Sequence, residues 1–155
     1  MIGHRVICSL RCGIPVVILL VGLTPSHAYP QADAIKSRKD NFHVLSEQMK
    51  RVVQGLGDGV PINAMKDSIA AANQALLRLP SLFPPGSDRG NTRALPTIWT
   101  EPDRFKQAYD DATARMTELI AASDQTDRSQ FGAAVGRMVA ACGSRVLVSA
   151  RPPGQ

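Results

Sequence analysis

The chain has 155 residues, enough for one domain, and its 18 Lys and Arg residues against 13 Asp and Glu residues give a net charge of +5. Charges of both signs are interspersed along the sequence, without the basic patch that marks a nucleic-acid-binding surface. The composition therefore predicts no nucleic-acid partner and indicates a small protein with a mildly basic surface.

The N-terminal segment has the three parts of a secretory signal peptide. Arg5 and Arg11 supply a positively charged start, residues 14–23 form a short apolar run, and Ser26-His-Ala28 offers small residues at the positions that a signal peptidase reads. The apolar run is about ten residues long, too short for the roughly 20 residues that cross a bilayer as a helix. We therefore expect residues 1–28 to be removed, the protein to be periplasmic, and no membrane anchor to remain.

Residues 29–150 are then the mature domain, and residues 151–155 are a Pro/Gly-rich tail. The mature chain keeps 16 basic and 13 acidic residues, a net charge of +3, with one cysteine, Cys142, and one histidine, His43. A single cysteine forms no internal disulfide, and a single histidine completes no set of nucleophile, base and acid. The sequence also has no His/Cys metal spacing and no Gly-rich phosphate loop. We therefore expect a protein that is not an enzyme, without catalytic residues or a metal site.

Four stretches of the mature chain have the apolar spacing of α-helices, and none alternates as a half-buried strand would. The first runs from Ala32 to Gly55, and its seven-residue repeat is typical of a bundle seam. The repeat consists of Ile35, Phe42, Met49 and Leu56. His43 lies beside this seam and is predicted to face water. The second stretch begins at Pro61, which suits a first helical turn, and continues to Leu79 with apolar residues three and four apart.

Repeated Pro and Gly in residues 79–90 exclude a regular element there, and the connection continues to Trp99. Thr100-Glu-Pro-Asp103 predicts the start of the third helix, with the Thr100 hydroxyl as its cap and Pro102 in its first turn. The fourth helix follows a turn at residues 124–127. Its inner face carries Phe131, Val135, Met138 and Cys142.

This order of elements predicts an all-α fold, an antiparallel four-helix bundle with a long Pro/Gly-rich crossover between its second and third helices. A mature chain of this size buries a core without disulfides or metals. The methionines on the inner faces are expected to belong to that core. Cys142 has the same simple interpretation, because a free cysteine often behaves as a small buried hydrophobe.

Several segments, taken in their order, resemble one known family. They are Ala34-Ile-Lys-Ser-Arg38, Leu79-Pro-Ser-Leu-Phe83, Ala94-Leu-Pro-Thr-Ile-Trp99 and the fourth helix from Asp127. Together they are similar to the class II c-type cytochromes, the cytochrome c-prime group and its low-spin relatives. The resemblance implies an exported four-helix bundle that carries haem c and takes part in electron transfer or small-gas binding. It also implies a redox partner protein and a homodimer formed through the first two helices.

The family attaches haem through C-x-x-C-H on its last helix, since cysteines at i and i+3 face one way and histidine follows one turn on. Carried over from Asp127, the resemblance places Cys142 on the first cysteine, so that Cys142-Gly-Ser-Arg-Val146 stands for the motif. Arg145 and Val146 then occupy the positions of the second cysteine and the histidine. In a second register, Cys142 is the second cysteine and Gly143 replaces the histidine.

The resemblance also gives two further cofactor-binding candidates. Arg38 lies near the haem in the family, and Phe42 stands where low-spin relatives carry a methionine ligand, which matches the apolar distal pocket of the gas-binding group. The residues alone allow simpler interpretations, in which Arg38 extends its head into water from the bundle edge and Phe42 is part of the core. Two explanations of the incomplete motif remain open: a haem-free structural or ligand-binding bundle, and an altered reading frame after Ser144.

Overall fold

The computed structural model of the protein describes residues 31–144, with side chains to Cys142. Every regular element in this range is helical, which confirms the predicted all-α class. The predicted signal peptide, the tail at residues 151–155, and the motif positions Arg145 and Val146 lie outside the described residues.

The first two long helices form an antiparallel pair. Helix α1 spans Gln31–Gly57, and α2 spans Lys66–Arg78 after a short 3₁₀ turn, η1, at Ile62–Met65. Pro61 therefore precedes a 3₁₀ turn, and the α-helix begins later than the apolar spacing predicts. Gly59, with φ of 76°, reverses the chain between the helices in a conformation that costs glycine little.

The crossover contains two short helical turns that its Pro and Gly content did not predict. A second 3₁₀ turn, η2, occupies Leu79–Leu82, and helix α3 occupies Thr97–Thr100. Proline follows the first residue of η2 and precedes α3, positions at which the missing N–H and fixed φ are tolerated. Repeated proline therefore limits the length of these turns and does not abolish them.

The third and fourth long helices are α4, Pro102–Ser123, and α5, Arg128–Ser144. The predicted cap at Thr100 is wrong: its hydroxyl donates to the carbonyl of Pro96 at 3.4 Å inside α3, and Glu101 stands at the N-cap of α4. Pro102 begins α4 as predicted. The carboxylate of Asp127 caps α5, accepting from the backbone amides of Ser129 and Gln130 at 2.8 and 3.1 Å.

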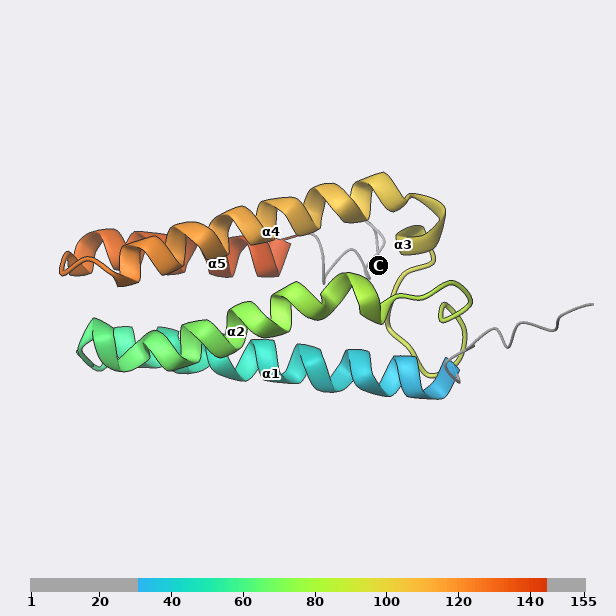
Figure 1. The fold of residues 1–155 in the computed structure, drawn as a ribbon, viewed down its shortest axis with the longest axis horizontal. Helices are drawn as coiled ribbons and strands as arrows, with labels where there is room; N and C mark the ends of the chain where they lie inside the picture. The colour runs from blue at the N-terminus through green and yellow to red at the C-terminus, as the bar shows by residue number, and fades with distance from the viewer. Residues whose placement is uncertain (1–30, 145–155) are drawn as a thin grey trace, which may run out of the picture.

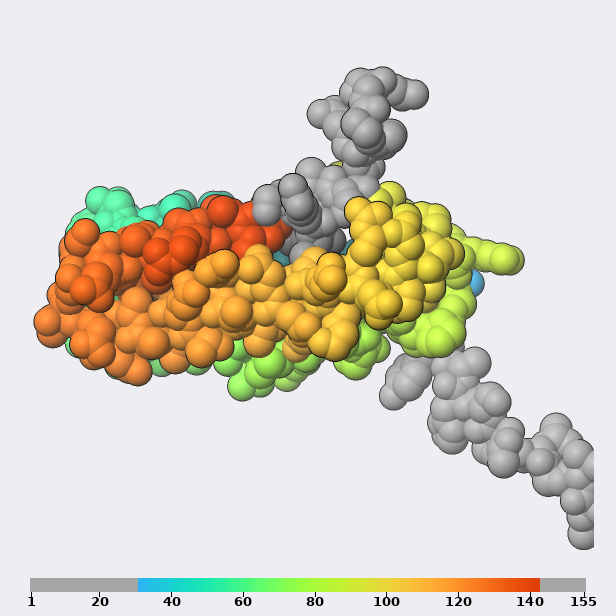
Figure 2. Space-filling model, turned by 90° about the horizontal axis from the view of Figure 1, so that it is seen from above, coloured from blue at the N-terminus to red at the C-terminus, as the bar shows by residue number. Residues whose placement is uncertain are grey.

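The helices pack as two antiparallel pairs, α1 with α2 and α4 with α5, joined at one end of the molecule by the crossover and α3 (Figure 1). Helices α4 and α5 run side by side over one face of the bundle (Figure 2). These contacts confirm the antiparallel four-helix bundle. Among the described residues, none of the helices has the length and apolar character needed to cross a membrane.

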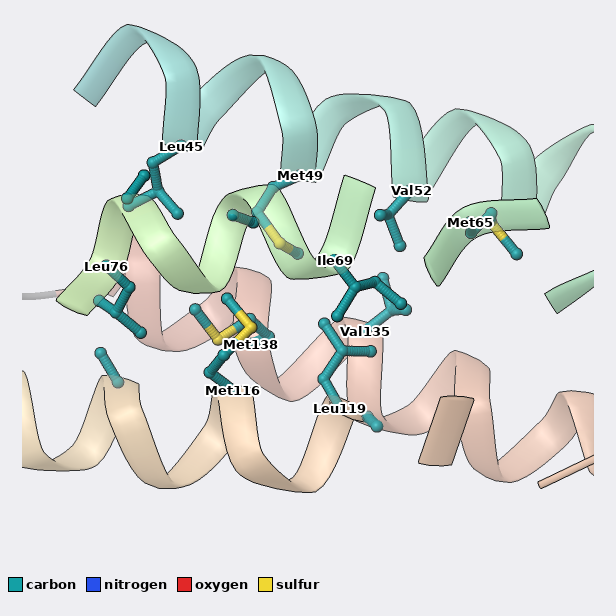
Figure 3. Packing of buried hydrophobic residues seen from close by; sticks show 14 of the residues in the cluster. Leu45, Met49, Val52, Met65, Ile69, Leu76, Met116, Leu119, Val135 and Met138 are labelled. Atoms are coloured by element: carbon teal, nitrogen blue, oxygen red, sulfur yellow. The ribbon is translucent and has the colours of Figure 1, made fainter. Parts of the chain in front are cut away.

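The four long helices bury one continuous hydrophobic core between them. In Figure 3, Leu45, Met49 and Val52 of α1 point toward Ile69 and Leu76 of α2, with side chains of α4 and α5 below them. The largest fully buried side chains include Phe131, Ile69, Leu76, Met116, Leu119 and Met138. Each contributes about 1.5–3 kcal/mol by leaving water. The apolar seams and the methionines therefore form the core as predicted.

Arg128 connects the two helix pairs at the end opposite the crossover. Its guanidinium donates to the carbonyl of Leu56 at 2.6 Å and to that of Val60 at 2.8 Å. The last carbonyls of a helix have no partner inside it and carry partial negative charge, so a cation there is favourable. Arg128 thus satisfies the end of α1 from the beginning of α5.

Candidate functional site

Arg38 is the centre of a polar and aromatic site at the crossover end of the bundle. It lies on the inner side of α1, only 3% exposed. Its guanidinium donates to the carbonyl of Ser87 at 3.0 Å and to the hydroxyl of Thr92 at 3.1 Å. Longer contacts of 3.4 Å reach the carbonyl of Leu82 and the hydroxyl of Ser87. Arg38 therefore holds the crossover from residue 82 to residue 92 against α1.

The burial of Arg38 excludes the simpler of its two interpretations, in which the head group extends into water. Burial lowers the pKa of the Arg38 guanidinium, because desolvation disfavours its charge, yet arginine stays protonated at any ordinary pH. No Asp or Glu of the described residues forms an ion pair with it. Neutral acceptors and aromatic rings therefore solvate this charge.

Four aromatic side chains, Phe42, Phe83, Trp99 and Phe105, form what we name the aromatic cluster, and two of them, Phe83 and Trp99, lie against this guanidinium. Phe83 is its hub, with ring centroids 6.4 Å from Phe42, 5.9 Å from Trp99 and 5.0 Å from Phe105. The guanidinium carbon of Arg38 lies 4.7 Å from the centroid of Phe83 and 5.5 Å from that of Trp99, both within cation–π range. The indole N–H of Trp99 donates to the carbonyl of Pro84 at 3.1 Å, which ties its ring to the crossover.

Phe42 joins the aromatic cluster to the core. Its ring meets Phe83 edge to face at an interplanar angle of 70°, and it is partly buried against the core cluster. Arg38 and Phe42 lie one helical turn apart on α1, so both reach Phe83 from the same helix face. The structure thus brings together two of the three predicted cofactor-binding residues.

Cys142, the third candidate, lies near the end of α5 and is a free cysteine. It is partly buried and packs against the core that Met138 enters one turn earlier, so its predicted inward direction is confirmed. Burial raises the pKa of the Cys142 thiol, because the thiolate would lose its solvation. Cys142 is therefore a protonated thiol at neutral pH, partly shielded from solvent.

The described residues do not assemble a metal-binding site around His43 or elsewhere. His43 is exposed on α1, as predicted. The described residues contain no group of three His, Cys, Asp or Glu side chains that would hold a metal ion. Among the described residues, the groups available for binding are the buried guanidinium of Arg38, the aromatic cluster and the thiol of Cys142.

Sequence reasoning missed three members of the site: Ser87, Thr92 and the hub Phe83. Ser87 is 2% exposed, and its hydroxyl also donates to the carbonyl of Pro84 at 2.8 Å. A sequence signal existed, since Arg38 is a charged residue on an apolar helix face and requires acceptors. Their identity could not be read, because they lie 44 to 54 positions further along the chain.

A sequence model of the family described as Cytochrome C' matches residues 33–144, nearly the whole described range. The chain therefore belongs to the cytochrome c' family, within the class of all-helical bundles that the fold defines. The match begins in the first turn of α1 and ends at Ser144, two residues after Cys142.

Individual relatives support the same assignment. The chain is 35% identical over 116 residues to cytochrome c' of Rubrivivax gelatinosus, covering 71% of this chain and 88% of that protein. It is 32% identical over 142 residues to cytochrome c-554 of Cereibacter sphaeroides, covering 84% and 92%. The crystal structure of the Rubrivivax gelatinosus cytochrome c' superposes with a TM-score of 0.66 at 30% identity, covering 72% of this chain and 90% of that one.

Proposed function

We propose that the protein is an exported, non-enzymatic, haem-binding member of the cytochrome c' family, with a role in electron transfer or in the binding of small gas molecules. The observation that carries this proposal is the placement of Cys142. It lies on the last helix, faces the core and occupies the first cysteine position that the family resemblance gives. Arg38, Phe42 and the aromatic cluster are the proposed protein environment of the cofactor.

The donor set of this chain does not fit haem attachment by two thioethers and an axial histidine. Arg145 and Val146 stand in the second cysteine and histidine positions, and neither side chain forms a thioether or ligates iron. His43 is exposed on α1. Covalent attachment of haem to this chain is therefore limited to one thioether at Cys142, and the motif's axial position carries no iron ligand.

The second candidate function is a haem-free bundle with a structural or ligand-binding role. Two observations favour it. The haem-attachment motif lacks its second cysteine and its histidine. The buried charge of Arg38 is already solvated by Ser87 and Thr92 without any ligand. A third explanation, an altered reading frame after Ser144, is tested by sequencing the gene beyond that codon.

Expression with the c-type maturation machinery separates these candidates. The proposal expects a Soret band and an intact mass raised by one haem, and Cys142→Ala should lose the mass increment. A colourless, folded, helical protein would contradict the proposal and support the haem-free bundle. An Arg145→Cys, Val146→His double variant is the matched control for the expression system, because it restores the full motif on the same scaffold.

Export and assembly follow from the same proposal. We expect the predicted signal peptide to deliver the mature protein to the periplasm, and N-terminal sequencing of the exported protein should then begin at Tyr29. We also propose a homodimer through α1 and α2, on which Val44, Val53 and Leu77 are exposed apolar side chains. Analytical ultracentrifugation should show a dimer that Leu77→Glu weakens, and a monomer at all concentrations would contradict this assembly. A redox partner protein is the remaining expectation from the family.

A further inference from the structure

A surface hollow of about 400 Å³ lies between the first turns of α1 and the crossover, and its lining includes neither Cys142 nor a member of the aromatic cluster. Figure 1 shows the beginning of α1 beside the crossover loop at this end of the molecule. Its volume falls in the range of roughly 300–1,000 Å³ that is usual for small-molecule sites. The hollow is therefore large enough for a small organic ligand.

The floor of the hollow is apolar and held in a fixed arrangement. Ala32 and Ile35 contribute from α1, and Gly90 contributes from the crossover. Gly90 has φ of 96°, and a Cβ added to it would come within 3.3 Å of Cδ1 of Ile35, so glycine permits this close approach. The side-chain amide of Gln31 donates to the carbonyl of Arg89 and ties the two walls together. The apolar floor is thus formed where the first turns of α1 pack against the crossover at Arg89 and Gly90.

The rim of the hollow is basic. Lys36 and Lys39 rise from α1 and Arg89 from the crossover, while the described lining residues include no Asp or Glu. The ammonium of Lys36 pairs with Asp40 at 2.6 Å, and the guanidinium of Arg89 is 3.9 Å from Asp88. Lys39 has no ion pair with a described residue. The charge of Lys39 and most of that of Arg89 are therefore open to an incoming anion.

We propose that this hollow binds a small organic anion with an apolar body, whose charged group lies between Lys39 and Arg89 and whose body covers Ile35 and Gly90. An apolar floor favours the uncharged part of such a ligand, and the two cations select the sign of its charge. The proposal is independent of haem binding, because it uses none of the residues assigned to that role.

The test uses 2-naphthoate as the probe, with the uncharged 2-naphthamide as its matched analogue. Titration of the purified protein, followed by backbone amide shifts, should perturb Ala32, Ile35, Gly90 and Asn91 first. Naphthoate should bind at least about fivefold more tightly than naphthamide, since each exposed ion pair contributes a few-fold at low salt. Raising the salt concentration should reduce this difference.

The Lys39→Glu, Arg89→Glu double variant should weaken naphthoate binding at least about fivefold and leave naphthamide binding unchanged. Lys50→Glu is the control, because Lys50 is exposed on the same helix outside the hollow. Equal binding of the two probes, shifts centred on Cys142 or Phe42, or insensitivity to the double variant would each overturn the proposal. Far-UV circular dichroism checks that the variants remain folded.

Discussion

The middle of the bundle and its crossover end are stabilised in different ways. In the middle, helices α1, α2, α4 and α5 interlock apolar side chains such as Val52, Met116 and Leu119, all fully buried. At the crossover end, Arg38 donates hydrogen bonds to Ser87 and Thr92 across an aromatic cluster that is only partly buried. The first region depends on hydrophobic packing, and the second depends on one cation.

The two regions therefore have different roles: the core holds the helices together, and Arg38 positions the crossover. A close-packed apolar core fixes the helices to one another but contains no group that would recognise a ligand. A buried guanidinium with neutral acceptors costs desolvation energy, and its directional hydrogen bonds hold residues 82–92 in one position against α1. Substitutions in the two regions should therefore have separable effects on global stability and on the crossover.

The largest effect is expected in the middle of the bundle. Phe131→Ala removes a fully buried ring from α5 and should lower the free energy of unfolding by about 3–5 kcal/mol. Urea denaturation of the purified protein measures this change. Val139→Ala is the matched control, since Val139 is 44% exposed on the same helix and should cost below about 0.5 kcal/mol. A loss under about 1 kcal/mol for Phe131→Ala would show that the core is loosely packed.

Arg38→Met should have a smaller and more local effect, about 1–3 kcal/mol, because it leaves Ser87 and Thr92 without their buried donor. Hydrogen exchange should accelerate at the amides of residues 87 and 92 before it changes in α1, α2 or α4. Lys39→Met, one position further along the same helix, should change neither quantity. Uniform acceleration across the chain would mean that core and crossover open as one unit.

Arg128→Ala tests the end of the bundle opposite the crossover. It removes the donor to the carbonyls of Leu56 and Val60 and should cost about 1 kcal/mol, less than Arg38→Met, because water replaces a donor at this part-buried site. Thermal unfolding measures the change. Arg104→Ala, which removes only an exposed pair with Glu101, is the control. A larger loss than that of Arg38→Met would reverse the order expected here.

The smallest effect concerns the surface pairing of α4 with α5. The hydrogen bond from Arg137, aided by the charge of Arg115, lowers the pKa of Glu118 below its ordinary value. Stability from a lowered carboxyl pKa is present above the ordinary value and is lost as pH falls through the folded-state value. Glu118→Gln should therefore lower the melting temperature slightly at neutral pH and not at strongly acidic pH. A difference that persists at acidic pH would exclude charge as its cause.

The helices and their buried faces could be predicted from sequence because apolar spacing repeats within single segments. Phe131, Val135, Met138 and Cys142 all face inward for this reason. The predicted Thr100 cap failed because the competing α3 turn engaged its hydroxyl with the carbonyl of Pro96. Local signals therefore identified the elements well and their boundaries less well.

The candidate site was likewise predicted from the sequence only in part. The resemblance in the sequence selected Arg38, Phe42 and Cys142, and the spacing of Arg38 and Phe42 already placed them on one helix face. No local pattern could show that Arg38 is buried, since its acceptors come from the crossover and are neutral.

The sequence by itself determined the all-α class, the four apolar faces and the incomplete Cys142-Gly-Ser-Arg-Val146 motif, because each is defined by residues within a single short segment. The tertiary structure alone decided where the charge of Arg38 goes, that Phe83 joins the aromatic rings, and that Gly90 approaches Ile35 below a basic rim. These features depend on contacts between α1 and a crossover about 50 residues away, and such contacts form only when the bundle closes.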